Sequence, residues 1–371
     1  MKSFDNYFKE RNYKTNEKIK VILSELPYFC SEFFMGIENQ TTYLTRLNYA
    51  QDLKNFFNFL VTEILEFNNK KIKDLKIEDL SLITATHIEL YLNYLSGYYI
   101  DDKYYTNSEN GKSRKLATIK SFLKYFYKKD KIESNVASKI DTPKIRNKEI
   151  TRLEINEVVD LLDEAENPER LTERQISYSK NTKKRDIALL SLLLGTGIRV
   201  SECVGINVED INFDINGFKI TRKGGAQVVL YFSNEVAEIL KDYLEERENN
   251  TKIPIEEKAL FVSLQNKRIT VRAVEKLVKK YSEASVPLKK ITPHKLRSTY
   301  GTNLYRETGD IYIVADVLGH KDVNTTKKHY AAISEDARRS VANAVKLRDK
   351  IEKLKEGVRK ELSDTVKLRK E

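Results

Sequence analysis

The sequence is poor in cysteine and in long apolar runs. Its 371 residues include only two cysteines, Cys30 and Cys203, which lie far apart along the chain. This scarcity excludes a disulfide framework and a cysteine-based zinc cluster, so both residues are expected to be buried, reduced thiols. No stretch approaches the roughly 18 apolar residues that a membrane-spanning helix needs, and the N-terminal segment lacks the apolar core of a signal peptide. We therefore expect a cytoplasmic protein with no membrane role.

Acidic residues are also too few to balance the basic ones. Lysine and arginine number 66 against 55 aspartates and glutamates, which gives a formal net charge of +11. Such a surface favours a polyanionic partner, such as nucleic acid, over an acidic small substrate. The length exceeds that of one ordinary compact core and predicts two domains, each large enough to fold without disulfides.

The first domain is expected to be a helical bundle. Between residues 15 and 129, apolar side chains recur at intervals of three and four, which is the period of amphipathic helices. Residues 130–150 are charged, contain Pro143 and show little periodicity, as is typical of an exposed linker. We place a helical DNA-binding domain at residues 1–140 and the linker at residues 141–150.

The second domain, residues 151–333, is expected to mix helices with a small sheet. Thr151 and Glu154 have the spacing of a capping box at the start of a helix. A long apolar segment further on has helical periodicity and is interrupted at Gly195 and Gly197.

A pair of strands is expected after this helix. Alternating apolar residues flank Gly224 and Gly225, which is the pattern of a hairpin with a glycine turn. Helical periodicity then returns, and residues 334–371 have the pattern of a highly charged helical tail. The predicted fold class is therefore mainly α with a small β-sheet, as a helical domain followed by an α+β domain.

Two polar side chains are associated with the glycine turns. Arg199 directly follows the glycine break and can project from a helix start, and Glu202 is close enough on that helix to hold its guanidinium. Lys223 lies at the tip of the predicted hairpin, where an ammonium could donate a proton to a leaving oxygen. Taken alone, Arg199 could instead be a solvated charge or a salt-bridge partner, and Lys223 could be a solubilising turn lysine.

Three of the four histidines lie in two motifs near the C-terminus. In TPHKLRS, His294 and Arg297 are three residues apart on one predicted helix, so they share a face. Histidine can accept or relay a proton near neutrality, and arginine can bind two phosphoryl oxygens. A structural histidine that caps this helix is the alternative.

The second motif, LGHKDVNTTKKHY, contains a histidine and a candidate nucleophile. Gly319 allows a tight turn, and His320 could donate a hydrogen bond to a phosphate oxygen. Tyr330 follows ten residues later, and its phenol could attack phosphorus if a proton acceptor were near. We treat the adjacent His329 as structural or solvated.

Taken together, these side chains resemble the catalytic pattern of the tyrosine recombinases. That pattern is arginine, lysine, His-x-x-Arg, histidine and tyrosine, and this sequence supplies it as Arg199, Lys223, His294, Arg297, His320 and Tyr330. The resemblance spans residues 185–331 and, more loosely, the segment SRKLATIKSFLKYF. Within the family the chain looks most like the Xer recombinases that act as a single protein.

The resemblance implies cutting and rejoining of DNA strands without a metal or another cofactor. Tyr330 would attack the scissile phosphate to form a 3′-phosphotyrosine bond. Arg199 and Arg297 would hold the non-bridging oxygens, and His320 would add a hydrogen bond.

It also implies how the protons move. Lys223 would protonate the departing 5′-oxygen, and His294 would accept or relay the phenol proton. Glu202 would steady the guanidinium of Arg199 in a supporting role.

The implied partner is double-stranded DNA with a near-palindromic core site, bound by a homotetramer that spans two such sites. Residues 334–371 would dock on a neighbouring protomer, and an activating partner protein is possible. In the first domain, the basic candidates for DNA contact are Arg46, Arg114, Lys115, Lys120 and Lys124.

Resolution of chromosome dimers is the biological role that fits a Xer-type protein. The integrase of a phage or conjugative element has the same chemistry and is the first alternative. A DNA-binding protein without cleavage activity and a type IB topoisomerase are the others.

Overall fold

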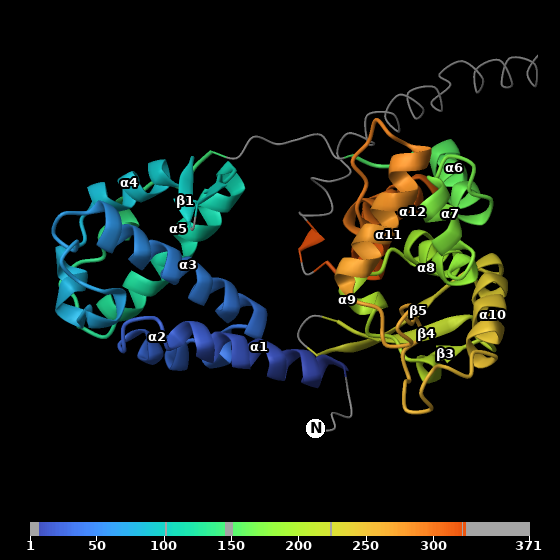
Figure 1. Cartoon of the computed structure of the whole chain (residues 1–371), viewed down its shortest axis with the longest axis horizontal. Coiled ribbons are helices and arrows are strands. Elements are labelled where there is room, and N and C mark those ends of the chain that lie inside the picture. The colour runs from blue at the N-terminus through green and yellow to red at the C-terminus, as the bar shows by residue number, and fades with distance from the viewer. Residues whose placement is uncertain (1–6, 101, 145–150, 223–224, 321, 324–371) are drawn as a thin grey trace, which may run out of the picture. The chain divides into compact units, whose positions relative to one another are not determined.

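The computed structural model describes residues 7–100, 102–144, 151–222, 225–320 and 322–323 (Figure 1). The chain divides into two compact units, residues 1–148 and 149–371, and the division falls within the segment predicted as a linker. The prediction of a mainly helical fold with a small β-sheet is confirmed. No described helix combines the length and apolar character needed to cross a bilayer.

The described residues of unit 1 form five α-helices. They are α1 (Tyr7–Leu23), α2 (Cys30–Gly36), α3 (Tyr43–Glu63), α4 (Ala85–Tyr94) and α5 (Glu109–Tyr127), with 3-10 turns η1 (Glu38–Gln40), η2 (Ile72–Asp74), η3 (Ile77–Leu82) and η4 (Val136–Lys139). Hydroxyl side chains cap the starts of α3, α4 and α5. Thr42 accepts a hydrogen bond from the backbone N–H of Thr45 at the start of α3, and Ser108 accepts one from Gly111 at the start of α5.

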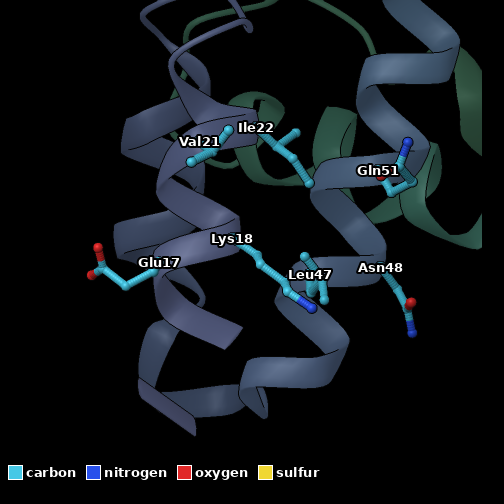
Figure 2. A pocket seen from close by; sticks show the side chains of 7 residues that line it. All are labelled: Glu17, Lys18, Val21, Ile22, Leu47, Asn48 and Gln51. Carbon is cyan, nitrogen blue, oxygen red and sulfur yellow. The ribbon is translucent and has the colours of Figure 1, made fainter. Parts of the chain in front are cut away.

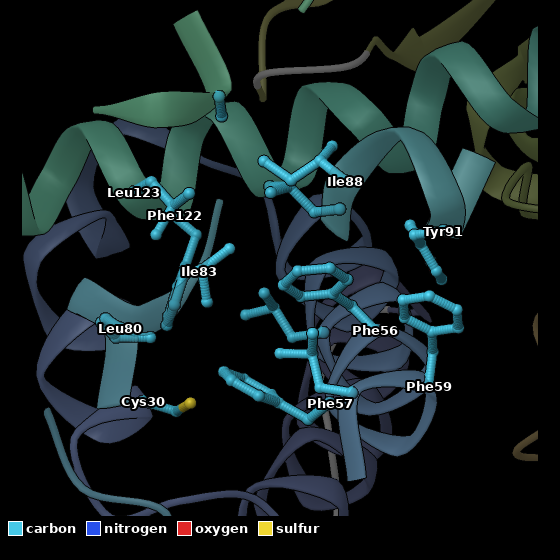
Figure 3. Packing of buried hydrophobic residues seen from close by; sticks show 14 of the residues in the cluster. Cys30, Phe56, Phe57, Phe59, Leu80, Ile83, Ile88, Tyr91, Phe122 and Leu123 are labelled. Atoms are coloured by element: carbon cyan, nitrogen blue, oxygen red, sulfur yellow. The ribbon is translucent and has the colours of Figure 1, made fainter. Parts of the chain in front are cut away.

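Aromatic rings fill the core of this unit (Figure 3). Phe33, Phe57 and Phe122, from α2, α3 and α5, are almost fully buried. The rings of Phe33 and Phe122 meet edge to face at 5.1 Å, and those of Phe57 and Phe122 at 5.8 Å. Such pairs add to the free energy gained from burial alone, so these three helices form one packed body.

A short hairpin in unit 1 was not predicted. Strands β1 (Tyr98–Ile100) and β2 (Lys103–Tyr105) pair antiparallel, with Tyr98 opposite Tyr105. Asp102, in the turn, has a positive φ of 59°, which aspartate tolerates better than most residues. The segment's tyrosines were compatible with a strand, but each strand is too short to show an alternating pattern.

A buried carboxylate joins α3 to α5. Asp52 is 1% exposed and accepts two hydrogen bonds from the guanidinium of Arg114, at 2.5 and 2.8 Å. The ammonium of Lys115 lies 3.3 Å from the same carboxylate, and the hydroxyl of Thr118 donates to it at 2.9 Å. A buried charge is tolerated only when it is paired and hydrogen-bonded, and this group satisfies both conditions.

A groove also runs between α1 and α3 of this unit. Figure 2 shows its lining side chains, which are Glu17, Lys18, Val21, Ile22, Leu47, Asn48 and Gln51. Three of these side chains are aliphatic, two are amides and two are charged.

Unit 2 contains the remaining helices and a three-stranded sheet. The helices are α6 (Ile155–Glu166), α7 (Glu173–Ser179), α8 (Lys183–Thr196), α9 (Val200–Cys203), α10 (Asn234–Glu248), α11 (Val271–Ser285), α12 (Pro293–Thr308) and α13 (Ile311–Leu318), with the 3-10 turn η5 (Val208–Asp210). The antiparallel sheet has the order β3 (Ile211–Asn212), β4 (Gly217–Thr221), β5 (Gln227–Tyr231). The predicted hairpin is confirmed as β4 and β5, with Phe218 opposite Leu230.

Helix α8 lies at the centre of this unit and packs against α6, α10 and α12 (Figure 1). Most of its apolar side chains are buried, which explains their nearly continuous run in the sequence. The carboxylate of Asp186, 1% exposed, accepts hydrogen bonds from the hydroxyls of Thr182 and Tyr281 and pairs with Arg185. These contacts tie the start of α8 to α11.

One predicted helix start was wrong. Helix α6 begins at Ile155, and its capping box is formed by Glu154 and Glu157, not by Thr151 and Glu154. The carboxylate of Glu157 accepts from the backbone N–H of Glu154 at 2.7 Å. The backbone N–H of Leu153 instead donates to the hydroxyl of Thr299 on α12, so a tertiary contact holds this stretch extended before the helix starts.

Both cysteines are free and buried, as expected. Burial raises the pKa of each thiol, that of Cys203 to about 12, and the neighbouring Glu202 carboxylate adds to this shift. The thiols therefore stay protonated near neutral pH and behave as small apolar side chains.

Replacement of Asp52 by alanine is expected to destabilise unit 1 by about 3–5 kcal/mol, because it leaves the ammonium of Lys115 buried without its carboxylate. Urea denaturation combined with amide hydrogen exchange in α3 and α5 measures this loss. Glu63→Ala, at the exposed end of the same helix, is the control and should change stability by less than about 0.5 kcal/mol. Equal effects of the two substitutions would contradict the assigned role of Asp52.

Candidate active site

The site begins where α8 ends. Gly197 terminates this helix with a φ of +60°, in the left-handed region. A Cβ at this position would lie 2.4 Å from the ring of Tyr300 and 3.0 Å from Leu318, so both the backbone and the space require glycine. The chain then turns, and Arg199 becomes the N-cap residue of α9. The break predicted at Gly197 therefore places the arginine, whereas Gly195 lies inside α8.

Glu202 contacts Arg199 in two ways. Its Oε2 accepts from the backbone N–H of Arg199, and its Oε1 accepts from Nη1 of the guanidinium, both at 2.9 Å. Glu202 is 4% exposed, whereas about a third of the Arg199 side chain is exposed. The carboxylate thus fixes a guanidinium that remains open to solvent on its other side.

Arg297 connects the ends of two helices. It lies on α12, which starts with Pro293 in its first turn, and its side chain is buried. Its Nη1 donates to the carbonyl of Gly197 at 2.7 Å, and its Nη2 donates to the carbonyl of Leu318. His294, in the first turn of the same helix, is exposed.

The end of α13 places His320. Gly319 ends this helix with a φ of +61°, and the backbone N–H of His320 donates to the carbonyl of Ala315 at 2.9 Å. The Nη2 of Arg199 donates to the carbonyl of Gly319 at 3.2 Å. Arg199, Arg297 and His320, which are more than 100 residues apart at the extremes, therefore meet around one helix end.

Two of the six predicted catalytic residues, Lys223 and Tyr330, lie outside the described residues, as do His329 and the predicted tail. Helix α12 carries another phenol close to the site, that of Tyr300. Burial raises the pKa of Tyr300, so this phenol is poorly suited to act as a nucleophile at neutral pH. In the described part of the chain, no three histidine, cysteine, aspartate or glutamate side chains are grouped as metal ligands.

The arrangement suits the binding of an anionic tetrahedral group. A guanidinium has five N–H donors, and Arg199 uses two of its side-chain donors in the contacts above. A guanidinium that is already fixed and still has N–H donors available can bind phosphoryl oxygens without the entropy cost of ordering its side chain. Arg297 and His320 lie at the same helix end.

The predicted DNA-contact residues of unit 1 lie in different surroundings. Lys124 is exposed, and Arg114 is exposed although it is paired with Asp52. Lys115 and Arg46 are buried, the latter 2.8 Å from Glu38 and stacked on Tyr43. The ammonium of Lys120 donates to the carbonyl of Ile140.

Of the five candidates, Arg114 and Lys124 are exposed, whereas Lys120 is half-buried and Arg46 and Lys115 are buried. DNA contact by all five residues stays a prediction. Arg46 and Lys115 could reach a phosphate only after their internal pairs open.

Sequence reasoning missed one arginine of this site. Arg222, next to Lys223 in the sequence, donates from its guanidinium to the carbonyls of Asp316 and Val317 in α13. The only available signal was its position beside a predicted catalytic residue in the hairpin.

The sequence matches the phage integrase family over residues 146–336. It is 32% identical over 305 residues to the tyrosine recombinase XerC of Caldanaerobacter subterraneus subsp. tengcongensis, with 80% of this chain and 79% of that protein covered. The chain belongs to the phage integrase family of tyrosine recombinases. The expectation of a site-specific DNA recombinase is thereby confirmed.

Other relatives match nearly the whole length. The tyrosine recombinase XerS of Streptococcus uberis is 26% identical, with 88% of this chain and 97% of that protein covered. Among solved structures, the XerH recombinase bound to the palindromic difH substrate aligns with a TM-score of 0.61 at 19% identity, covering 88% of each chain. A lambda integrase dimer on a core site aligns with a TM-score of 0.57 at 16% identity, covering 80% of this chain and 95% of that one. These structures share the fold.

Glu202→Gln is expected to slow DNA cleavage by about 100-fold, because a neutral amide holds Arg199 less firmly and small displacements at a reacting centre cost rate. DNA affinity should change little. Single-turnover cleavage and equilibrium binding measure the two quantities. Glu209→Gln, an exposed glutamate on the following turn, is the matched control and should keep the full rate. A full rate in Glu202→Gln would show that the carboxylate is not needed.

Proposed function

We propose that this recombinase cuts DNA through a 3′-phosphotyrosine bond to Tyr330, with Arg199, Lys223, His294, Arg297 and His320 as the other catalytic residues. The observation that carries this proposal is the meeting of Arg199, Arg297 and His320 at the end of α13. These side chains are donors that phosphoryl oxygens accept, and no local feature of the sequence requires them to be neighbours.

In this scheme the bond between the Tyr330 oxygen and phosphorus forms while the bond from phosphorus to the 5′-oxygen breaks. Arg199 and Arg297 bind the non-bridging oxygens, whose charge shifts during the transfer, and His320 adds a third donor. The phenol proton passes to His294, which is exposed at the start of α12. Lys223 supplies a proton to the departing oxygen.

The energetics fit a reversible reaction. One phosphodiester replaces another of similar free energy, so rejoining is the same step with the 5′-hydroxyl as nucleophile. Fixed donors and orientation lower the barrier in both directions, and no nucleotide needs to be hydrolysed.

For the biological role, we infer resolution of chromosome dimers at a near-palindromic site by a homotetramer. The support is that XerC and XerS relatives match most of this chain. The XerH structure holds a palindromic substrate, and a lambda integrase tetramer is bound to a Holliday junction. Residues 334–371 are proposed to contact the neighbouring protomer, and a requirement for an activating protein is left to experiment.

For DNA contact in unit 1, we propose Lys124 and the exposed edge of Arg114 as the first contacts with phosphate. Lys120 lies on the same helix, four residues before Lys124. Arg46 and Lys115 remain candidates that would have to leave their present partners. Each neutralised phosphate should steepen the salt dependence of binding by about 0.9 in log affinity against log salt.

Tyr330→Phe is expected to abolish covalent protein–DNA adducts on a nicked suicide substrate while DNA affinity is retained, because only the nucleophilic oxygen is removed. Denaturing gel electrophoresis of labelled DNA detects the adduct. Tyr312→Phe removes an exposed phenol on α13 and is the control, which should form adducts at the wild-type yield. An unchanged adduct yield in Tyr330→Phe would remove this residue from the proposed role.

Footprinting on DNA from the chromosome terminus region tests the biological role. A single near-palindromic protected site is expected there, and a plasmid with two copies of that site should be resolved to monomers by the purified protein. Protection only at the ends of a mobile element would support the integrase alternative. Relaxation of supercoils without any site preference would support a topoisomerase.

A further inference from the structure

Three arginines share the last carbonyl groups of α13. Arg222 donates to Asp316 and Val317, Arg297 to Leu318, and Arg199 to Gly319. The last carbonyls of a helix lack partners within the helix and carry its partial negative charge. Four consecutive carbonyls thus accept hydrogen bonds from three guanidiniums, which come from three separate elements.

Arg222 comes from the hairpin and is held there by its backbone. It directly follows β4, its N–H donates to the carbonyl of Ala226 at 2.8 Å, and its carbonyl accepts from Gly225 at 3.0 Å. Its Nη1 lies 3.2 Å from the carbonyl oxygen of Asp316, and its Nη2 lies 2.8 Å from that of Val317. The planar fork of the guanidinium therefore reaches two neighbouring carbonyls with two separate nitrogens, a fixed geometry that the single nitrogen of an ammonium does not provide.

Gly319 provides the space for this guanidinium. A Cβ at this position would lie 1.9 Å from Nη1 and 2.4 Å from Cζ of Arg222. Any side chain at residue 319 would therefore displace the end of Arg222. The left-handed φ at Gly319 fits asparagine better than other non-glycine residues, so the steric effect can be separated from backbone strain.

We propose that Arg222 is a positioning residue for DNA cleavage, which fixes the end of α13 and thereby the place of His320 at the phosphate. This inference rests on the proposed function and adds a residue to it. Without Arg222, the carbonyl of Val317 loses this donor and that of Asp316 keeps the backbone N–H of Gly319, so the last turn of α13 loosens. His320, whose backbone is bonded to Ala315 of this turn, moves with it.

A positioning role predicts a loss of rate and not of affinity. Arg222→Ala should slow single-turnover cleavage at saturating DNA by about 10- to 100-fold, because His320 is displaced from the reacting phosphate. The dissociation constant and its salt slope should stay within about twofold of wild type. Arg222→Lys keeps the charge but not the fork, and should recover only part of the rate.

The decisive experiment is a double-mutant cycle with His320→Ala, measured as single-turnover adduct formation on the suicide substrate. If Arg222 acts through His320, the double variant should be within about threefold of His320→Ala alone. Multiplication of the two single losses would overturn the proposal. Lys219→Ala removes an exposed cation from strand β4 and is the matched control, with no loss of rate expected.

Gly319→Asn tests the same contact from the other side. It should reproduce the rate loss of Arg222→Ala, and the two substitutions combined should be no worse than either alone. A wild-type cleavage rate in Gly319→Asn would overturn the proposal. A loss of DNA affinity in Arg222→Ala, with a shallower salt dependence of binding, would also overturn it, because Arg222 would then be a phosphate contact. Thermal melting of each variant identifies any that fails to fold, and Arg222→Lys then replaces Arg222→Ala in the cycle.

The outcome also separates this inference from the proposed function. If wild-type protein forms no adduct that depends on Tyr330, both are wrong. If the adduct forms but the losses multiply, only the role of Arg222 is wrong.

Discussion

The described part of the candidate site is organised around the carbonyl groups at the C-terminal end of α13. A helix end needs donors for these groups, and here the donors are the guanidiniums of Arg199, Arg222 and Arg297. The same contacts hold α9, the β4–β5 hairpin and α12 against the C-terminal end of α13. Because left-handed glycines end both α8 and α13, at Gly197 and Gly319, each helix stops where these arginines can reach its carbonyls.

Much of this site could be predicted because its parts have local signals. Glycines at 195 and 197 ended the apolar pattern before Arg199, and the i, i+3 spacing put His294 and Arg297 on one helix. What brought the motifs together was the resemblance to the tyrosine recombinases, since spacing alone says nothing about distances across more than 100 residues. Arg222 gave no signal of its own, because its partners are backbone carbonyls, which every residue possesses.

The basic face of α5 shows the limit of periodicity. The helical period predicted for residues 15–129 is confirmed in α5, where Leu116, Ile119 and Leu123 are buried, but a period does not tell which nearby cations face solvent. The structure instead turns Arg114 and Lys115 toward Asp52, a carboxylate more than 60 residues earlier in the chain. One buried acid changes which basic residues are accessible, and helical period carries no information about it. Helical period likewise carries no information about Thr299, whose hydroxyl on α12 accepts from the backbone N–H of Leu153 just before α6 starts.

The choice of carbonyls as anchors has an electrostatic consequence. A carboxylate partner orients a guanidinium but also cancels its charge, whereas a carbonyl dipole orients it and leaves most of the charge in place. Among the described residues, Glu202 is the acid that pairs with Arg199, while Arg222 donates to carbonyls. The arginines are therefore ordered before DNA arrives and the site stays positive. Both conditions favour the tight binding of a phosphate whose charge is shifting between oxygens, because little reorganisation is then needed at the moment of reaction.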